Sequence, residues 1–139
     1  IICEDLPEES NRVTLHPELT DSDGIPCPKV VYKLSRNTKK MMAFGIEKGK
    51  EVMEASGAKE IYTFGPVRNT GWHLMGTARM GDDRENSVVN KYGMSHDVEN
   101  LYVIDSSIFP TGGGVNPTST IQATALYVTE NIKTRRDLL

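Results

Sequence analysis

Two loops of this chain carry residue types that could do acid–base chemistry. His73 stands in the sequence GWHLMGTAR (residues 71–79), shortly before the glycine of its turn, and Asn116 follows the glycine run of residues 112–114. A neutral imidazole, with a reference pKa of about 6.5, takes a proton from a hydroxyl group at neutral pH. The two loops therefore predict a site, in which His73 is either a base or a buried structural histidine.

The other two histidines do not add to this site. His16 precedes Pro17 in a turn and His96 lies in the loop of residues 95–97, so we expect both side chains to be exposed. Three histidines on different loops lack the spacing of metal ligands, which predicts that the chain holds no metal. No GxSxG motif supplies a serine nucleophile, so a small hydrolase that uses His73 is disfavoured.

A helix is expected directly after the second loop. Asn116 suits its N-cap and Pro117 its first position. The free N–H groups at such a helix start stabilise an anion, which Asn116, Pro117 and Thr118 would face. One face of the helix is expected to be buried, because apolar residues recur there at helical spacing: Ile121, Ala125, Val128 and Ile132.

The segment before this loop predicts a buried strand. Residues 100–105 are apolar without alternation, which is typical of a strand covered on both faces, and the segment ends in Asp105. A strand that ends in front of a helix N-terminus is where α/β folds hold nucleotide cofactors, and glycines let the backbone approach a flat ligand. Taken alone, however, the glycine run is equally typical of an ordinary turn.

The first part of the chain predicts an antiparallel sheet covered by a helix. Three short strands are expected over residues 1–3, 12–15 and 29–33, and a further strand over residues 59–64. The helix is expected over residues 37–56, with a cap at Ser35 or Asn37 and an end at Gly57. Residues 67–99 read as a long loop, which is often a functional feature. The helix carries a stripe more typical of a core than of a cofactor site: Met42, Ile46, Gly49 and Met53.

Composition narrows the class of protein. The net charge is −3 with scattered basic residues, which does not favour nucleic-acid binding, and no apolar stretch is long enough to cross a bilayer. We therefore expect a soluble protein of the cytoplasm or the periplasm. Cys3 and Cys27 could face each other, but without a CxxC pattern they are more typical of small buried residues. The chain begins at Ile1 rather than Met, which indicates a piece of a longer protein.

Three ordered motifs carry a family resemblance. Residues 73–81 (HLMGTARMG), 100–110 (NLYVIDSSIFP) and 116–123 (NPTSTIQA) resemble the C-terminal region of the glucose–methanol–choline (GMC) oxidoreductases. The sequence is more similar to the sugar and polyol dehydrogenases and the pyranose-oxidase-like members than to the other oxidases. The first part of the chain resembles the family more loosely, as the start of its substrate-domain sheet.

The resemblance implies FAD-dependent oxidation of an alcohol to a carbonyl. At the family's positions, His73 is the base that accepts the hydroxyl proton, and Asn116 holds the substrate oxygen, since an amide is no base at neutral pH. Trp72 either lines the flavin or substrate pocket or packs locally. The remaining cofactor-binding residues implied by the family positions are Asp105 and Ser106 on the ribityl and pyrophosphate side, and Asn116, Pro117 and Thr118 at the pyrimidine end.

The resemblance also implies an α+β fold in two parts. Residues 1–99 would form the substrate-binding and catalytic portion, and residues 100–139 the strand and helix that return to the FAD-binding domain. The family's GxGxxG fingerprint is absent here, so an N-terminal FAD-binding portion is an expected partner, beside an alcohol or sugar substrate and an electron-acceptor protein. Alone, the chain is expected to self-associate and to be inactive. The alternative is a non-catalytic binding or assembly module that keeps the same fold.

Overall fold

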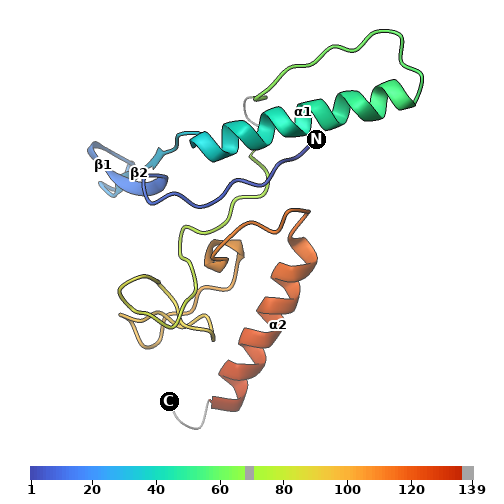
Figure 1. Ribbon diagram of the computed structural model, residues 1–139. Helices are drawn as coiled ribbons and strands as arrows, with labels where there is room; N and C mark the ends of the chain where they lie inside the picture. The colour runs from blue at the N-terminus through green and yellow to red at the C-terminus, as the bar shows by residue number, and fades with distance from the viewer. Residues whose placement is uncertain (68–70, 136–139) are drawn as a thin grey trace. The chain divides into compact units, whose positions relative to one another are not determined.

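The computed structural model describes residues 1–67 and 71–135, which divide into two compact units (Figure 1). The first unit comprises Ile1 and Cys3–Gly65, and the second comprises Ile2 and the residues from Pro66 onward. In chain order the elements are β1 (Arg12–Thr20), β2 (Pro26–Val31), α1 (Arg36–Ala55), the 3-10 helix η1 (Ser106–Ile108) and α2 (Thr118–Arg135). Two antiparallel strands and two α-helices confirm the α+β class.

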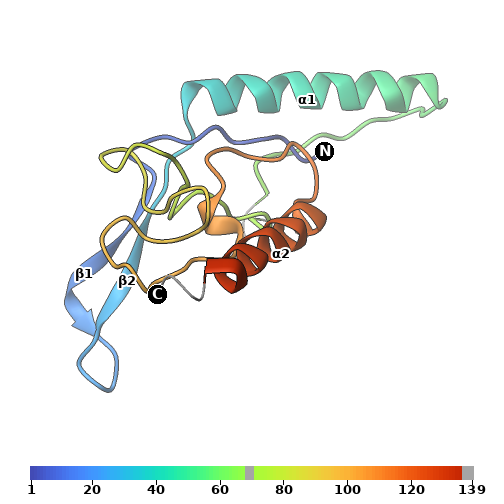
Figure 2. The same ribbon diagram turned by 90° about the horizontal axis from the view of Figure 1, so that it is seen from below.

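The sheet of the first unit is a hairpin of two strands, which Figure 2 shows with its connecting loop. β1 and β2 pair antiparallel from Arg12 opposite Val31 to Thr20 opposite Pro26, with a shift of register in between. The strand expected over residues 1–3 is absent, so the three-stranded meander was wrong. These residues instead approach α1: a Cβ added to Gly45 would lie 2.8 Å from the Cys3 sulfur. Because glycine has no side chain, the N-terminal segment can lie close to the helix backbone at this position.

The helix α1 begins and ends with the expected capping residues. The Ser35 hydroxyl accepts a hydrogen bond of 3.1 Å from the N–H of Thr38. At the other end, the N–H groups of Gly57 and Ala58 donate to the carbonyls of Glu54 and Met53, which is a Schellman motif. The expected bounds of residues 37–56 are confirmed to within one residue. The expected buried stripe holds in part, because Met42, Ile46 and Gly49 are half-buried but Met53 is exposed.

Two other expected strands do not form. Residues 59–64 are not a strand, and Tyr62 is 84% exposed. Residues 100–105 contribute one isolated bridge, from Tyr102 to Met94, and Leu101 is 49% exposed. The apolar pattern of residues 100–105 predicts a strand covered on both faces. Among the described residues, however, this segment has no neighbouring strand with which it could pair. The expected long loop is confirmed as largely irregular chain between residues 71 and 99, while residues 68–70 of that prediction lie outside the described residues.

The second unit packs its loops against α2, and they lie beside it in Figures 1 and 2. Val89, Ile108 and Val128 are fully buried, and Ile121, Ala125 and Ile132 of the expected stripe are half-buried. Tyr92 stacks on Tyr127 of α2, with 6.4 Å between the ring centroids. The stripe predicted from helical spacing is therefore confirmed as the side of α2 that faces this small core.

Candidate functional site

The His73 segment, residues 73–81, is hydrogen-bonded to η1. The N–H groups of Gly76, Ala78 and Met80 donate to three consecutive carbonyls, those of Ser106, Ser107 and Ile108, over 3.4, 2.9 and 2.7 Å. The motif around His73 and the motif that contains Asp105 are therefore neighbours in space, although the bonded residues are 28 to 30 positions apart in sequence.

A side-chain bond and a glycine reinforce this attachment. The Ser106 hydroxyl donates to the carbonyl of Leu74, the residue after His73, over 2.7 Å. Gly76 has a positive φ of 86°, and a Cβ there would lie 3.3 Å from the carbonyl oxygen of Phe109. Only glycine fits this backbone without strain, so the turn after His73 depends on it.

His73 itself is half-buried, and its ring makes no hydrogen bond within residues 1–67 and 71–135. Its neighbours Trp72 and Leu74 are 81% and 74% exposed. The imidazole is therefore not held by a polar partner in the part of the chain described, and its nitrogens keep their capacity to bond a ligand. Trp72 does not pack into the core formed by the described residues.

Asp105 is a capping residue in this structure. It is the N-cap of η1, and its carboxylate accepts the N–H of Ser107 over 2.7 Å. The hydroxyl of Ser107 and then its N–H lower the pKa of Asp105 from its ordinary 3.8. A lowered pKa means that the cap stabilises the fold above the ordinary value and loses that contribution as the pH falls below about 3.8. Asp105 is exposed, so this stabilisation is small.

Asn116 lies on the loop that leads into α2. Its side chain is exposed, Pro117 is buried, and α2 begins at Thr118, one residue later than expected. The first turn of α2 presents exposed residues, Thr118, Ser119 and Thr120, whose N–H groups have no partner four residues earlier inside the helix. Within the described residues no hydrogen bond joins Asn116 to His73. The structure thus brings together His73, Asp105 and Ser106, and leaves Asn116 on a separate loop of the same unit.

Both histidines expected to be exposed are half-buried and hydrogen-bonded. His16 Nδ1 accepts the N–H groups of Glu18 and Leu19. His96 Nε2 lies 2.9 Å from the Ser87 hydroxyl and 3.1 Å from the carbonyl oxygen of Gly81, the last residue of the His73 segment. No sequence pattern indicates the His96 contacts, because they join loops that come together only in the fold.

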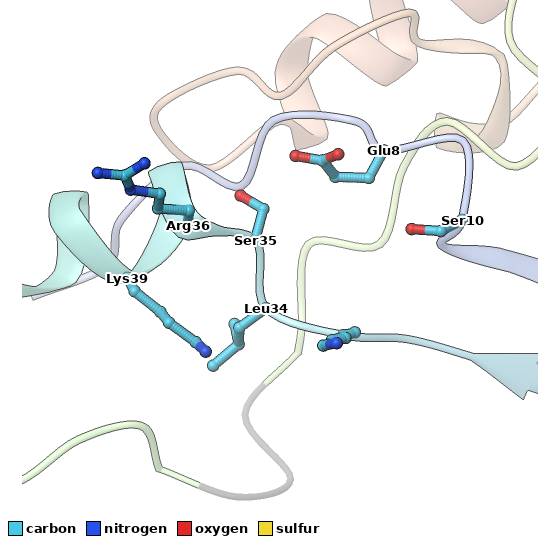
Figure 3. Close-up of a pocket in the computed structure, with 7 residues that line it drawn as sticks. Glu8, Ser10, Leu34, Ser35, Arg36 and Lys39 are labelled. Atoms are coloured by element: carbon cyan, nitrogen blue, oxygen red, sulfur yellow. The ribbon is translucent and has the colours of Figure 1, made fainter.

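A surface hollow of about 310 Å³ lies in the first unit (Figure 3). Basic, acidic and apolar side chains line it, and it contains none of the candidate residues, so it is not part of the His73 site. Its lining residues come from the chain before β1, from the segment between β2 and α1, and from the start of α1: Glu8, Ser10, Lys33, Leu34, Ser35, Arg36 and Lys39.

Metal and disulfide chemistry have no support among the described residues. Residues 1–67 and 71–135 contain no group of three histidine, cysteine or acidic side chains that could hold a metal ion. Cys3 and Cys27 are free thiols, each half-buried. The helices described are also too short or too polar to span a membrane.

Comparison with known proteins places these motifs in a family. A family model described as GMC oxidoreductase, covering the C-terminal domain, matches residues 7–125. The 2-methyl-1,2-propanediol dehydrogenase of Mycolicibacterium austroafricanum is 45% identical over 133 residues, which is 95% of this chain and 24% of that protein. Paromamine 6'-oxidase of Streptomyces fradiae is 36% identical over 90% of this chain and 23% of its own length.

A third relative is the fructose dehydrogenase large subunit of Gluconobacter japonicus, 32% identical over 91% of this chain and 23% of that protein. The chain thus spans about a quarter of the length of the curated relatives it matches. The relatives are dehydrogenases and an oxidase named for 2-methyl-1,2-propanediol, fructose and paromamine, and the family model covers most of this chain. Together with the three motifs, these matches show that the chain belongs to the GMC oxidoreductase family and corresponds to its C-terminal domain.

Proposed function

We propose that this chain is the substrate-binding and proton-accepting part of an FAD-dependent enzyme that oxidises the CH–OH group of a sugar-like or polyol-like alcohol to a carbonyl. The observation that carries the proposal is the state of His73. Its ring has no hydrogen-bond partner in the part of the chain described, while the segment that bears it is bonded to η1. The names of the relatives, which include a diol and a sugar dehydrogenase, support this class of substrate.

The residues present fit an electron-rich, flat group such as the pyrimidine end of FAD. The first turn of α2 offers N–H groups at Thr118, Ser119 and Thr120, which are exposed residues, and a helix N-terminus stabilises negative charge placed against it. Gly113 and Gly114 present no side chain to a ligand approaching that turn. FAD, when bound, supplies the acceptor for the hydride that leaves the carbinol carbon.

Within this proposal, His73 and Asn116 act on the substrate hydroxyl. A neutral His73 imidazole accepts the hydroxyl proton as the O–H and C–H bonds break and the C=O bond forms. The Asn116 side-chain amide donates a hydrogen bond to the same oxygen and so orients it. In this arrangement the substrate oxygen would lie between the two side chains. The exposed indole of Trp72, adjacent to His73, would form part of the pocket wall.

Two other candidate residues make hydrogen bonds that hold the backbone of the site. Asp105 caps η1 and Ser106 donates a hydrogen bond to the Leu74 carbonyl, so both hold the backbone to which a cofactor would bind.

We propose that residues 1–99 supply the substrate-binding portion and residues 100–139 the segment that returns to the FAD-binding domain. In the structure of the chain itself, residues 71–99 pack in one unit with the segment after them.

Anaerobic addition of a vicinal diol or a hexose to the full-length protein tests the function. We expect the absorbance of oxidised flavin to fall, with one equivalent of carbonyl product per flavin. A full-length protein that binds FAD but keeps its oxidised spectrum with a panel of diols, polyols and sugars would contradict the proposal and favour a non-catalytic role.

The isolated chain of residues 1–139 is expected to hold little FAD. It lacks the GxGxxG fingerprint, and large apolar side chains that include Trp72, Val115 and Leu126 are exposed. The purified chain should therefore show no flavin absorbance and should associate with itself in size-exclusion chromatography. Stoichiometric flavin in the purified chain would show that the cofactor surface is complete without the rest of the protein.

Substitution of Ser106 tests the bond next to the base. In the full-length protein, Ser106→Ala removes the hydroxyl that holds the Leu74 carbonyl, and we expect the limiting rate of flavin reduction to fall about five-fold, the worth of one hydrogen bond. Ser106→Thr keeps the hydroxyl and should retain most of the rate. Equal rates for Ser106→Ala and the unaltered protein, in stopped-flow measurements, would show that this bond does not position His73.

A further inference from the structure

We propose that His96 is a positioning residue that fixes the carboxyl end of the His73 segment, residues 73–81, and through it the place of His73. The inference rests on the proposed function, because it assigns His96 to the same site. His96 was expected to be exposed in a loop, yet its ring is half-buried against Gly81 and Ser87.

The contacts of His96 define which ring nitrogen carries the proton. The Gly81 carbonyl, 3.1 Å from Nε2, can only accept a hydrogen bond. Ser87 has one hydroxyl proton, and the carbonyl oxygen of Asp83 is its closest acceptor. The Ser87 oxygen also lies 3.1 Å from the Gly81 oxygen, but with its proton on Asp83 it leaves the Nε2–H of His96 as the donor to Gly81. The Ser87 oxygen, 2.9 Å from Nε2, can share that proton.

His96 is itself fixed by its backbone. Its N–H donates to the carbonyl of Val88 over 3.1 Å, and the neighbouring Val89 is fully buried. Val89 in turn accepts the N–H of Gly81 over 2.9 Å. The backbones of His96 and of Gly81 are therefore both bonded to the segment of Val88 and Val89. Because the two backbones are held by the same segment, the bond between the ring and the Gly81 carbonyl costs little conformational entropy.

The His73 segment is consequently held along its length. Near its start, Ser106 holds the Leu74 carbonyl; in its middle, η1 accepts three N–H groups; at its end, His96 and Val89 hold both polar groups of Gly81. Loss of the His96 bond would leave the Gly81 carbonyl near only the Ser87 hydroxyl among the described donors, and the closest acceptor of that hydroxyl is Asp83, so the end of the segment would be held less firmly. A displacement of a catalytic group by about 1 Å costs up to about a hundred-fold in rate, so an effect at His73 is measurable.

Two amide variants of the full-length protein form a matched test. The amide nitrogen of glutamine corresponds in reach to Nε2 of histidine, whereas asparagine is one methylene shorter. With a vicinal diol as the probe, we expect His96→Asn to lower the limiting rate of flavin reduction about ten-fold, and His96→Gln to stay within about two-fold of the unaltered protein. Rates are compared per bound FAD. His16→Asn, which keeps an acceptor for the hairpin N–H groups, is the control and should leave the rate unchanged.

Amide hydrogen exchange of the same variants provides a readout that needs no activity. In His96→Asn, the amides of Met80 and Gly81 should exchange about five-fold faster, whereas those of α1 should not change. His96→Gln should restore their protection. Unchanged exchange and an unchanged rate in His96→Asn would overturn the proposal, as would an equal loss of rate in both variants. If no alcohol reduces the flavin of the unaltered protein, the proposed function fails, while the exchange experiment still tests the His96 contact.

Discussion

Replacement of His73 by alanine in the full-length protein is expected to slow the limiting rate of flavin reduction by about two to four orders of magnitude, which is the usual contribution of a positioned base. The expected loss comes from the missing base and not from a change of the fold. The His73 ring has no hydrogen-bond partner in the described chain, so its removal leaves in place the bonds between η1 and residues 76, 78 and 80. The rate is measured by anaerobic stopped-flow at saturating alcohol.

The His73 result needs a control for the loss of a histidine. His16→Ala removes a half-buried histidine from the hairpin of the first unit, and we expect FAD content and the rate of flavin reduction to stay close to those of the unaltered protein. A His73→Ala protein that binds FAD and reduces it at the unaltered rate would remove His73 from the proton transfer.

Replacement of Gly93 by alanine is expected to lower the free energy of unfolding by about 2 to 4 kcal/mol. Gly93 has a positive φ of 70°, and a Cβ there would lie 2.8 Å from the Val103 carbonyl oxygen and 3.2 Å from a methyl group of Val128. Backbone strain and the clash with a fully buried residue therefore add to each other. Urea unfolding of the full-length protein measures the change.

Gly24→Ala separates these two causes. Gly24 also has a positive φ, of 82°, but a Cβ there would meet nothing within 4 Å. This variant carries the backbone strain alone and should cost about 1 kcal/mol. Equal losses at Gly24 and Gly93 would show that the close approach of Gly93 to Val103 and to Val128 of α2 contributes nothing to stability.

The helices were predictable because their signals are local. Ser35 caps α1 through a bond to an N–H three residues away, and the Gly57 turn closes it through bonds within five residues. The stripe on α2 depends only on helical spacing, and Val128 in its middle is fully buried. Capping and periodicity are encoded within a few turns of chain, so a single sequence is sufficient to read them.

The strands were less predictable because a strand must pair with a second strand, and a single sequence does not identify that partner. Residues 12–15 and 29–33 were expected as strands and the hairpin forms, because a tight turn brings its two strands together. Residues 100–105 have the apolar pattern of a buried strand, but in the described chain they pair only through a bridge at Tyr102. A run of apolar residues indicates that a segment is buried, but it does not identify the strand with which the segment pairs.

For the site, the sequence indicated the residue types but not their bonds. The resemblance placed Asp105 and Ser106 near a cofactor, and the structure adds that they hold η1 and the Leu74 carbonyl. The contact of His96 with Gly81 joins residues 15 apart on separate loops, and no local pattern encodes it. The roles of His73 and Asn116 are predictions, and the rate of flavin reduction in the full-length protein tests the role of His73.

Chemical rescue of flavin reduction tests the central claim, that His73 is the base, most directly. With the full-length His73→Ala protein and a saturating diol, we predict that added imidazole raises the limiting rate at least about ten-fold, because a free base then takes the hydroxyl proton. The same addition should leave the rate of the unaltered protein unchanged. An equal response of both proteins to imidazole would contradict the account, because the added base would then not replace the His73 side chain.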